Sequence, residues 1–174
     1  IKASEMIHDK KKKTVYYNNA IIKIYDIPIF YTPKLSHPDP SVDRRSGFLL
    51  PKFSDSKNLG SGLSIPYYYA KGKDKDFTLT NNIYLNENPL FLGEYRQAFK
   101  NSNLTLDAGY TEGYKKTNAS KRSENKSHFY SNFVKLFESS NNSENLLKIK
   151  TQNVTNDKYL KLYRVQSDLV DYNQ

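Results

Sequence analysis

Alternating apolar and polar residues recur along most of the chain, and this period of two residues predicts β-strands. The alternation is clearest in the runs 77–85, 91–99 and 104–111. Each run places its large apolar residues on one face: Phe77, Leu79, Ile83 and Leu85, then Phe91, Tyr95 and Phe99, then Leu104, Leu106 and Tyr110. A soluble β-sandwich and a membrane β-barrel both produce such strands, so the alternation alone leaves both open.

Turn-forming segments separate these runs at short intervals. They are rich in Gly, Asn, Asp and Ser: SDSKNLG, KGKDK, NENP and KNSN. This cadence predicts hairpins joined into an antiparallel meander, and therefore an all-β fold.

Two earlier strands are predicted at 14–25 and 27–31, ahead of a proline-rich stretch. Pro33, Pro38 and Pro40 remove backbone donors and restrict φ, so we expect regular structure to stop there. This stretch is the best predicted boundary in the chain. It gives one domain at 1–40 and a second at 41–174.

The last third of the chain is harder to interpret. Phe129, Phe133 and Phe137 recur every four residues as on a helix, but Tyr130 and Val134 favour a strand, which is our interpretation. A further strand is predicted at 145–154, whereas 159–165 fits a strand or a short helix. The polar run 115–128 is expected to be a mobile exposed loop. The pattern alone does not decide the structure of 128–174.

The amino-acid composition supports the β interpretation and limits the chemical classes of binding partner. The 174 residues include 15 Tyr and 9 Phe, which suit pleated, half-exposed strands. A net charge of +9 favours phosphate-bearing partners such as nucleic acid, anionic lipid headgroups or lipopolysaccharide. Nucleic acid is disfavoured because the aromatic residues share faces with Leu and Ile, where burial explains them.

Several common features are missing from the sequence. There is no cysteine, so neither a disulfide framework nor a thiolate metal site can form within it. No apolar run approaches the roughly 20 residues of a membrane-spanning helix, and the start lacks the features of a signal peptide. The chain begins without Met, and we expect it to be cut from a longer protein, by nature, by cloning or through incomplete sequence data.

No catalytic or metal-binding pattern is present either. His8, His37 and His128 lie in unrelated segments without ligand spacing, and we interpret them as surface residues. The lysine run 10–13 could hold phosphate, but a solvated turn or strand-edge charge explains it better. The Gly60–Gly62 cluster is interpreted as a turn. We therefore predict no enzyme activity, no cofactor and no metal.

Four short motifs carry a resemblance to a known family. They follow in order: PIFYTP at 28–33, RRSGFLLP at 44–51, PYY at 66–68 and DFTLT at 76–80. Together they resemble the opening of the barrel in the LptD family of outer-membrane lipopolysaccharide-assembly proteins. The chain departs from the family pattern in having one residue fewer between the double arginine and Ser46. It also lacks the cysteines that link domains in many members, so disulfide-controlled maturation is unsupported.

The resemblance implies a fold and a function. Residues 1–40 would be the C-terminal end of a periplasmic β-jellyroll domain with its linker, and 41–174 the N-terminal strands of an incomplete transmembrane β-barrel. The segment would belong to a cell outer-membrane translocon that inserts lipopolysaccharide into the outer leaflet through a lateral gate, without catalysis. Implied partners are lipopolysaccharide, the plug lipoprotein LptE, the periplasmic bridge protein LptA and outer-membrane lipid. The alternative is a soluble periplasmic β-domain that binds an anionic ligand or partner protein.

The resemblance also suggests site residues. Pro51 and Pro66 would lie inside the first two barrel strands, on opposite arms of one hairpin, and would loosen the lateral gate. Arg44 and Arg45 would contact phosphorylated headgroups at the joint between the two domains. Hairpin parity would place the turns near 55–60, 86–90 and 115–127 outside the cell. Those near 71–75, 100–103 and 139–144 would then face the periplasm, together with residues 1–40.

Overall fold

The computed structural model describes residues 2–24, 26–39, 41, 44–112, 125–138 and 144–170. The predicted all-β class is confirmed, because antiparallel strands form nearly all of the described structure. The chain divides into two compact units, Ile1–Gly47 and Phe48–Gln174. Each unit is described by itself.

The first unit is a three-stranded antiparallel sheet in the order β1-β2-β3. Its strands are β1 (Glu5–Asp9), β2 (Thr14–Ile24) and β3 (Ile27–Pro38). Val15 and Ala20 are buried, but Met6, Ile27 and Phe30 are each more than half exposed. The described part of this sheet therefore leaves much of its apolar surface uncovered.

The proline-rich stretch does not end regular structure where we expected. β3 continues through Pro33 as far as Pro38, which is opposite Thr14 in β2. The prediction was wrong because β3 is an edge strand of its sheet. A proline there can place its nitrogen, which has no N–H, on the unpaired side of the strand, where no ladder hydrogen bond is lost.

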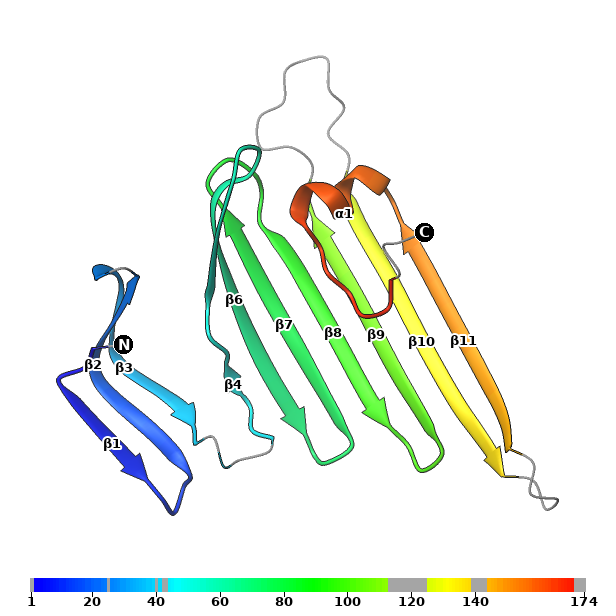
Figure 1. The fold of residues 1–174 in the computed structure, drawn as a ribbon, viewed down its shortest axis with the longest axis horizontal. Coiled ribbons are helices and arrows are strands. Elements are labelled where there is room, and N and C mark those ends of the chain that lie inside the picture. The colour runs from blue at the N-terminus through cyan, green and yellow to red at the C-terminus, as the bar shows by residue number, and fades with distance from the viewer. Residues whose placement is uncertain are drawn as a thin grey trace. The chain divides into compact units, whose positions relative to one another are not determined.

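The second unit is an eight-stranded antiparallel sheet in the order β11-β10-β9-β8-β7-β6-β4, with β5 also paired to β6 (Figure 1). The strands are β4 (Gly47–Phe48), β5 (Lys52–Ser56), β6 (Gly60–Lys71), β7 (Lys75–Tyr84), β8 (Leu90–Ala98), β9 (Ser102–Thr111), β10 (Lys126–Glu138) and β11 (Glu144–Val154). The predicted meander is confirmed, as are the strands at 129–137 and 145–154. Of the two alternatives for 159–165, the short helix is right, because residues 159–163 lie in helix α1 (Asp157–Tyr163).

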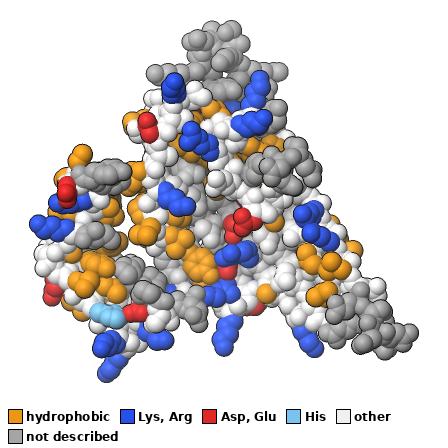
Figure 2. Space-filling view, viewed as in Figure 1, with side chains coloured by type: hydrophobic (Ala, Val, Ile, Leu, Met, Phe, Trp, Pro, Cys, Tyr) orange, Lys and Arg blue, Asp and Glu red, His pale blue; other side chains and the backbone are white. Residues whose placement is uncertain are grey.

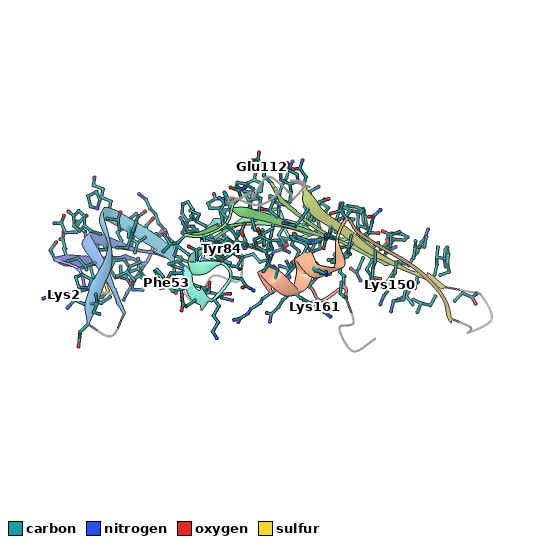
Figure 3. The ribbon with its side chains drawn as sticks, turned by 90° about the horizontal axis from the view of Figure 1, so that it is seen from above. Lys2, Phe53, Tyr84, Glu112, Lys150 and Lys161 are labelled. Atoms are coloured by element: carbon teal, nitrogen blue, oxygen red, sulfur yellow. The ribbon has the colours of Figure 1, made fainter. Side chains whose placement is uncertain are left out.

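Helix α1 covers one face of this sheet near the end where β9 stops and β10 begins (Figure 1). Seen from above, the sheet is curved and α1 lies on its concave side (Figure 3). The helix begins at Asn156, whose side chain accepts the Lys158 N–H, and ends at Arg164 in the left-handed conformation. Its packing creates the main hydrophobic core of the unit, formed by Leu59, Tyr84, Leu90, Tyr159, Tyr163 and Val165.

Candidate functional site

The two faces of the large sheet differ in chemistry. The strand register places Phe77, Tyr95 and Leu106 side by side on the convex face, and their neighbours two residues along each strand are mostly apolar as well. The concave face carries mainly polar residues, including Asp76, Arg96, Thr105 and Asn132. The large apolar side chains of the convex face stay exposed in the described structure: Tyr69, Phe77, Leu79, Ile83, Phe91, Tyr110 and Phe129.

His128 is the centre of a buried cluster on the concave face. Its Nε2 lies 3.2 Å from Oδ1 of Asp107, and its Nδ1 lies 3.1 Å from Oη of Tyr159 on α1. Because a carboxylate only accepts, Nε2 of His128 donates to Asp107, and in the tautomer with its proton on Nε2 the ring accepts the Tyr159 hydroxyl proton on Nδ1. Burial raises the pKa of the Tyr159 hydroxyl above its usual value, which keeps it as a donor. The ring of Tyr130 stacks on the imidazole at 4.7 Å.

This cluster attaches α1 to the sheet and depends on a glycine. A Cβ atom at Gly109 would lie 2.4 Å from His128 Cε1 and 2.7 Å from Tyr159 Oη. Any side chain at 109 would therefore push the histidine or the helix away. The interpretation of His128 as a surface residue was wrong. The end of the predicted loop at 126–128 is instead the start of β10, while most of that loop lies outside the described residues.

A second polar cluster lies on the same face, beside a pocket of about 340 Å³. Arg96 Nε donates to Oδ1 of Asp76 at 2.8 Å and lies 3.3 Å from Oε1 of Glu94. Tyr68 donates its hydroxyl proton to the other oxygen of Asp76. The pocket has a polar part and an apolar part. Its polar lining is Tyr68, Thr78, Thr80, Glu94, Arg96, Asp107 and Gln166, and its apolar lining is Leu49, Leu92 and Val165.

Pro51 and Pro66 lie at an interruption of the ladder along β6. Pro66 is buried inside β6, opposite Thr80 of β7, whereas Pro51 immediately precedes β5 and is not inside a strand. The Leu49 N–H donates to the Pro66 carbonyl at 2.9 Å, and Lys52 pairs with Ser64. Lys52 is therefore three residues after Leu49, whereas the residues opposite them, Ser64 and Pro66, are only two residues apart. This extra residue is a local β-bulge.

Arg45 has protein partners within the first unit. Its guanidinium donates to the carbonyl oxygens of Lys12 and Lys13 and to the Thr14 hydroxyl. The run 10–13 is the turn between β1 and β2, as the solvated-turn interpretation predicted, and Asp9 accepts the Lys11 and Lys12 N–H groups. The Arg44 side chain is exposed. The Arg45 side chain is exposed as well, and the contact of the two arginines with headgroups stays a prediction.

The chain end of the first unit is also attached to β1. Nε2 of His8 forms an ion pair with Oδ2 of Asp39 if the imidazole is protonated. The Ser41 N–H donates to the same carboxylate at 2.8 Å and lowers the pKa of Asp39 below its usual value. These contacts hold the segment after β3 against the β1–β2 hairpin.

Two other kinds of feature are absent from the described residues. No group of three or more His, Asp or Glu side chains there could hold a metal ion. No helix among them is long and apolar enough to cross a membrane.

No family model matches the chain, but several curated proteins do. It is 40% identical over 83 residues to the LPS-assembly protein LptD of Psychrobacter cryohalolentis, a match that covers 48% of the chain and 8% of the relative. The LptD of Methylococcus capsulatus is 37% identical over 106 residues, 60% of the chain and 10% of the relative. The resemblance to the LptD family is confirmed.

A third relative supports the same family over a slightly longer stretch. The LptD of Legionella pneumophila strain Paris is 33% identical over 110 residues, which is 63% of the chain and 13% of that protein. The chain thus spans between 8% and 13% of the length of these LptD relatives. What a complete LptD protein does therefore comes to this chain only as a proposal.

Proposed function

We propose that the eight-stranded sheet within the predicted domain 41–174 forms part of the wall of an outer-membrane β-barrel in a protein that assembles lipopolysaccharide. The observation that carries this proposal is the curved sheet with an apolar convex face and a polar concave face. In a membrane barrel, lipid-facing and lumen-facing side chains alternate along each strand in this way. The lipopolysaccharide in this proposal comes from the names of the LptD relatives, which are LPS-assembly proteins.

The height of the apolar face fits a bilayer. From Phe77 in β7 to Leu85 just after the strand, whose N–H still donates to the Ser61 carbonyl, the outward positions span about 27 Å at the usual rise per residue. A barrel strand is tilted by about 40°, which reduces this span to roughly 20 Å and approaches the ~25 Å apolar band of membrane barrels. Tyr69, Phe77 and Tyr95 pair across β6, β7 and β8, so they form an aromatic row near one end of the band. Aromatic rows of this kind mark membrane interfaces.

The remaining features extend the proposal. Residues 1–40 would be the end of a periplasmic β-jellyroll that receives lipopolysaccharide from LptA, and the barrel would work with LptE. The polar concave face, which carries the pocket beside Arg96, would face the water-filled interior. Transport by this wall needs no covalent chemistry, so we propose no enzyme activity.

The lateral gate would lie where the first barrel strand meets the last, and the two prolines would loosen it from the neighbouring seam between β6 and the segment of β4 and β5. Opposite residues in an antiparallel ladder can exchange two hydrogen bonds, but Pro66 can only accept one from Leu49 because it has no N–H. The bulge that ends at Pro51 removes further regular pairing at nearly the same height. Both prolines therefore weaken the same stretch of one seam.

The experiment that tests this role replaces Pro51 and Pro66 with Ala in the full-length protein. Ala at 66 has an acceptor in the Leu49 carbonyl, so the seam should gain about 1 kcal/mol there. We expect Pro66→Ala alone to slow delivery of lipopolysaccharide to the cell surface, the double variant to slow it slightly more, and barrel folding to stay intact. Pro89→Ala, in the exposed turn before β8, is the control and should deliver at the original rate. Normal delivery by the double variant would exclude these prolines from the gate.

A further inference from the structure

The hairpin between β6 and β7 ends in an unusual concentration of like charge. Its tip, KGKDK, carries Lys71, Lys73 and Lys75, with Asp74 offsetting one of the three charges. Lys71 and Lys75 are opposite each other in the ladder. Like charges directly opposite on one sheet face destabilise pairing. This tip therefore suits the binding of a negative group from outside the sheet.

A fourth lysine extends this charge to the next hairpin. The Ala98 N–H donates to the Asp74 carbonyl at 2.7 Å, which holds the two turns together. Lys100 lies in the second turn and is exposed, as are Lys71 and Lys73. Side chains of Lys and Arg project along this lower edge of the sheet (Figure 2). We call Lys71, Lys73, Lys75 and Lys100 the lysine row. The third hairpin at this end joins β10 to β11, and its two strands meet the turn at Glu138 and Glu144.

The lysine row borders the aromatic row of the convex face. Lys71 and Lys75 are two residues beyond Tyr69 and Phe77, so they point to the same side of the sheet. Aromatic side chains followed by lysines at the end of an apolar band are the pattern of a membrane interface, where the long lysine stem lies along lipid and its ammonium group reaches the headgroups.

We propose that the lysine row binds the phosphate groups of anionic glycerophospholipids in the leaflet at this end of the barrel. The inference rests on the proposed function, because it needs the convex face to lie in a bilayer. Phospholipid is favoured over lipopolysaccharide by hairpin parity. The turns of the lysine row lie at the end of the sheet from which β5 starts, which the proposed topology puts on the periplasmic side, opposite to the outer leaflet.

The test uses the full-length protein in nanodiscs of phosphatidylcholine with phosphatidylglycerol as a minor component. The ratio of the two lipids retained after mild extraction is measured by mass spectrometry. The triple variant Lys71→Gln, Lys75→Gln, Lys100→Gln should lose the enrichment of phosphatidylglycerol by at least fivefold, given the roughly fivefold contribution of one lysine near an anionic surface. The control triple Lys57→Gln, Lys158→Gln, Lys161→Gln removes the same charge near the other end of the sheet and should keep the enrichment.

Unchanged enrichment in the first triple variant, or an equal loss in the control, would overturn the inference. A second set of discs contains lipid A, and retention of lipid A instead of phosphatidylglycerol by the lysine row would overturn the choice of phospholipid. Entry of the protein into the discs without any enrichment contradicts this inference alone. Failure to enter discs of either composition contradicts the proposed function, and the inference with it.

Discussion

Gly109 is the residue on which the attachment of α1 depends most directly. Ala at this position would place a methyl group against His128 and Tyr159, and overpacking of this kind costs about 1–3 kcal/mol. We expect Gly109→Ala to lower the free energy of unfolding by this amount, measured by urea titration of the full-length protein in detergent. Gly93→Ala is the matched control, because its Cβ would meet only Phe77, at an ordinary contact distance of 3.4 Å. Equal losses in the two variants would contradict the packing argument.

We predict different effects for the replacement of Arg44 and of Arg45, although the two residues are adjacent in the sequence. Arg45 already donates to the β1–β2 turn, so Arg45→Gln should mainly loosen that turn. Arg44 is exposed as well, and we use it to test the headgroup contact: Arg44→Gln should reduce crosslinking of lipopolysaccharide to the full-length protein at least twofold, with normal expression. Lys34→Gln, on exposed β3, controls for loss of charge in the same unit. If crosslinking is unchanged in Arg44→Gln, the direct headgroup contact is wrong.

Contacts between residues far apart in the chain are what the sequence could not reveal. The alternation of β7, β8 and β9 was legible because it depends only on neighbours two residues apart. The His128 cluster joins residues 21 and 31 positions apart, through Asp107 and Tyr159. No local spacing marks such a contact. The one available signal was the alternation around His128, Tyr130 and Asn132, which places the histidine on the polar face of β10.

Helix α1 is short and needs its cap. The Asn156 side chain accepts the Lys158 N–H at 3.0 Å, and loss of such a cap costs about 1 kcal/mol. Asn156→Ala should therefore speed amide hydrogen exchange in 157–163 about fivefold, measured by mass spectrometry on the full-length protein. Asn153→Ala, at an exposed position of β11, should leave this exchange unchanged. An unchanged rate in Asn156→Ala would show that the cap does not limit opening of the helix.

The elements that were predicted well are those whose two faces differ. β7, β8 and β9 combine strong alternation with clear turns, and the structure has all three. β3 was predicted too short because the sequence does not reveal that it lies at an edge, where proline is tolerated. α1 was ambiguous because seven residues are too few for periodicity to separate a helix from a strand.

At the scale of the molecule, the central claim is that the convex face of the large sheet contacts lipid and the concave face contacts water. The apolar positions of the convex face are exposed in the described structure, and a bilayer would cover them without a second sheet. The soluble alternative instead requires a protein layer over the same face. The jellyroll and barrel assignments of 1–40 and 41–174 remain predictions that depend on this distinction.

The most direct measurement is cysteine accessibility along two strands, β7 and β9, of the full-length protein in liposomes. Single cysteines replace the convex residues Leu79, Leu106 and Ala108 and the concave residues Thr78, Thr80 and Thr105, in a background whose other cysteines are removed. The account predicts rapid labelling of the concave set by a water-soluble maleimide, and labelling of the convex set only by a lipid-soluble reagent. Rapid water-soluble labelling of both sets, or protection without a period of two, would contradict it.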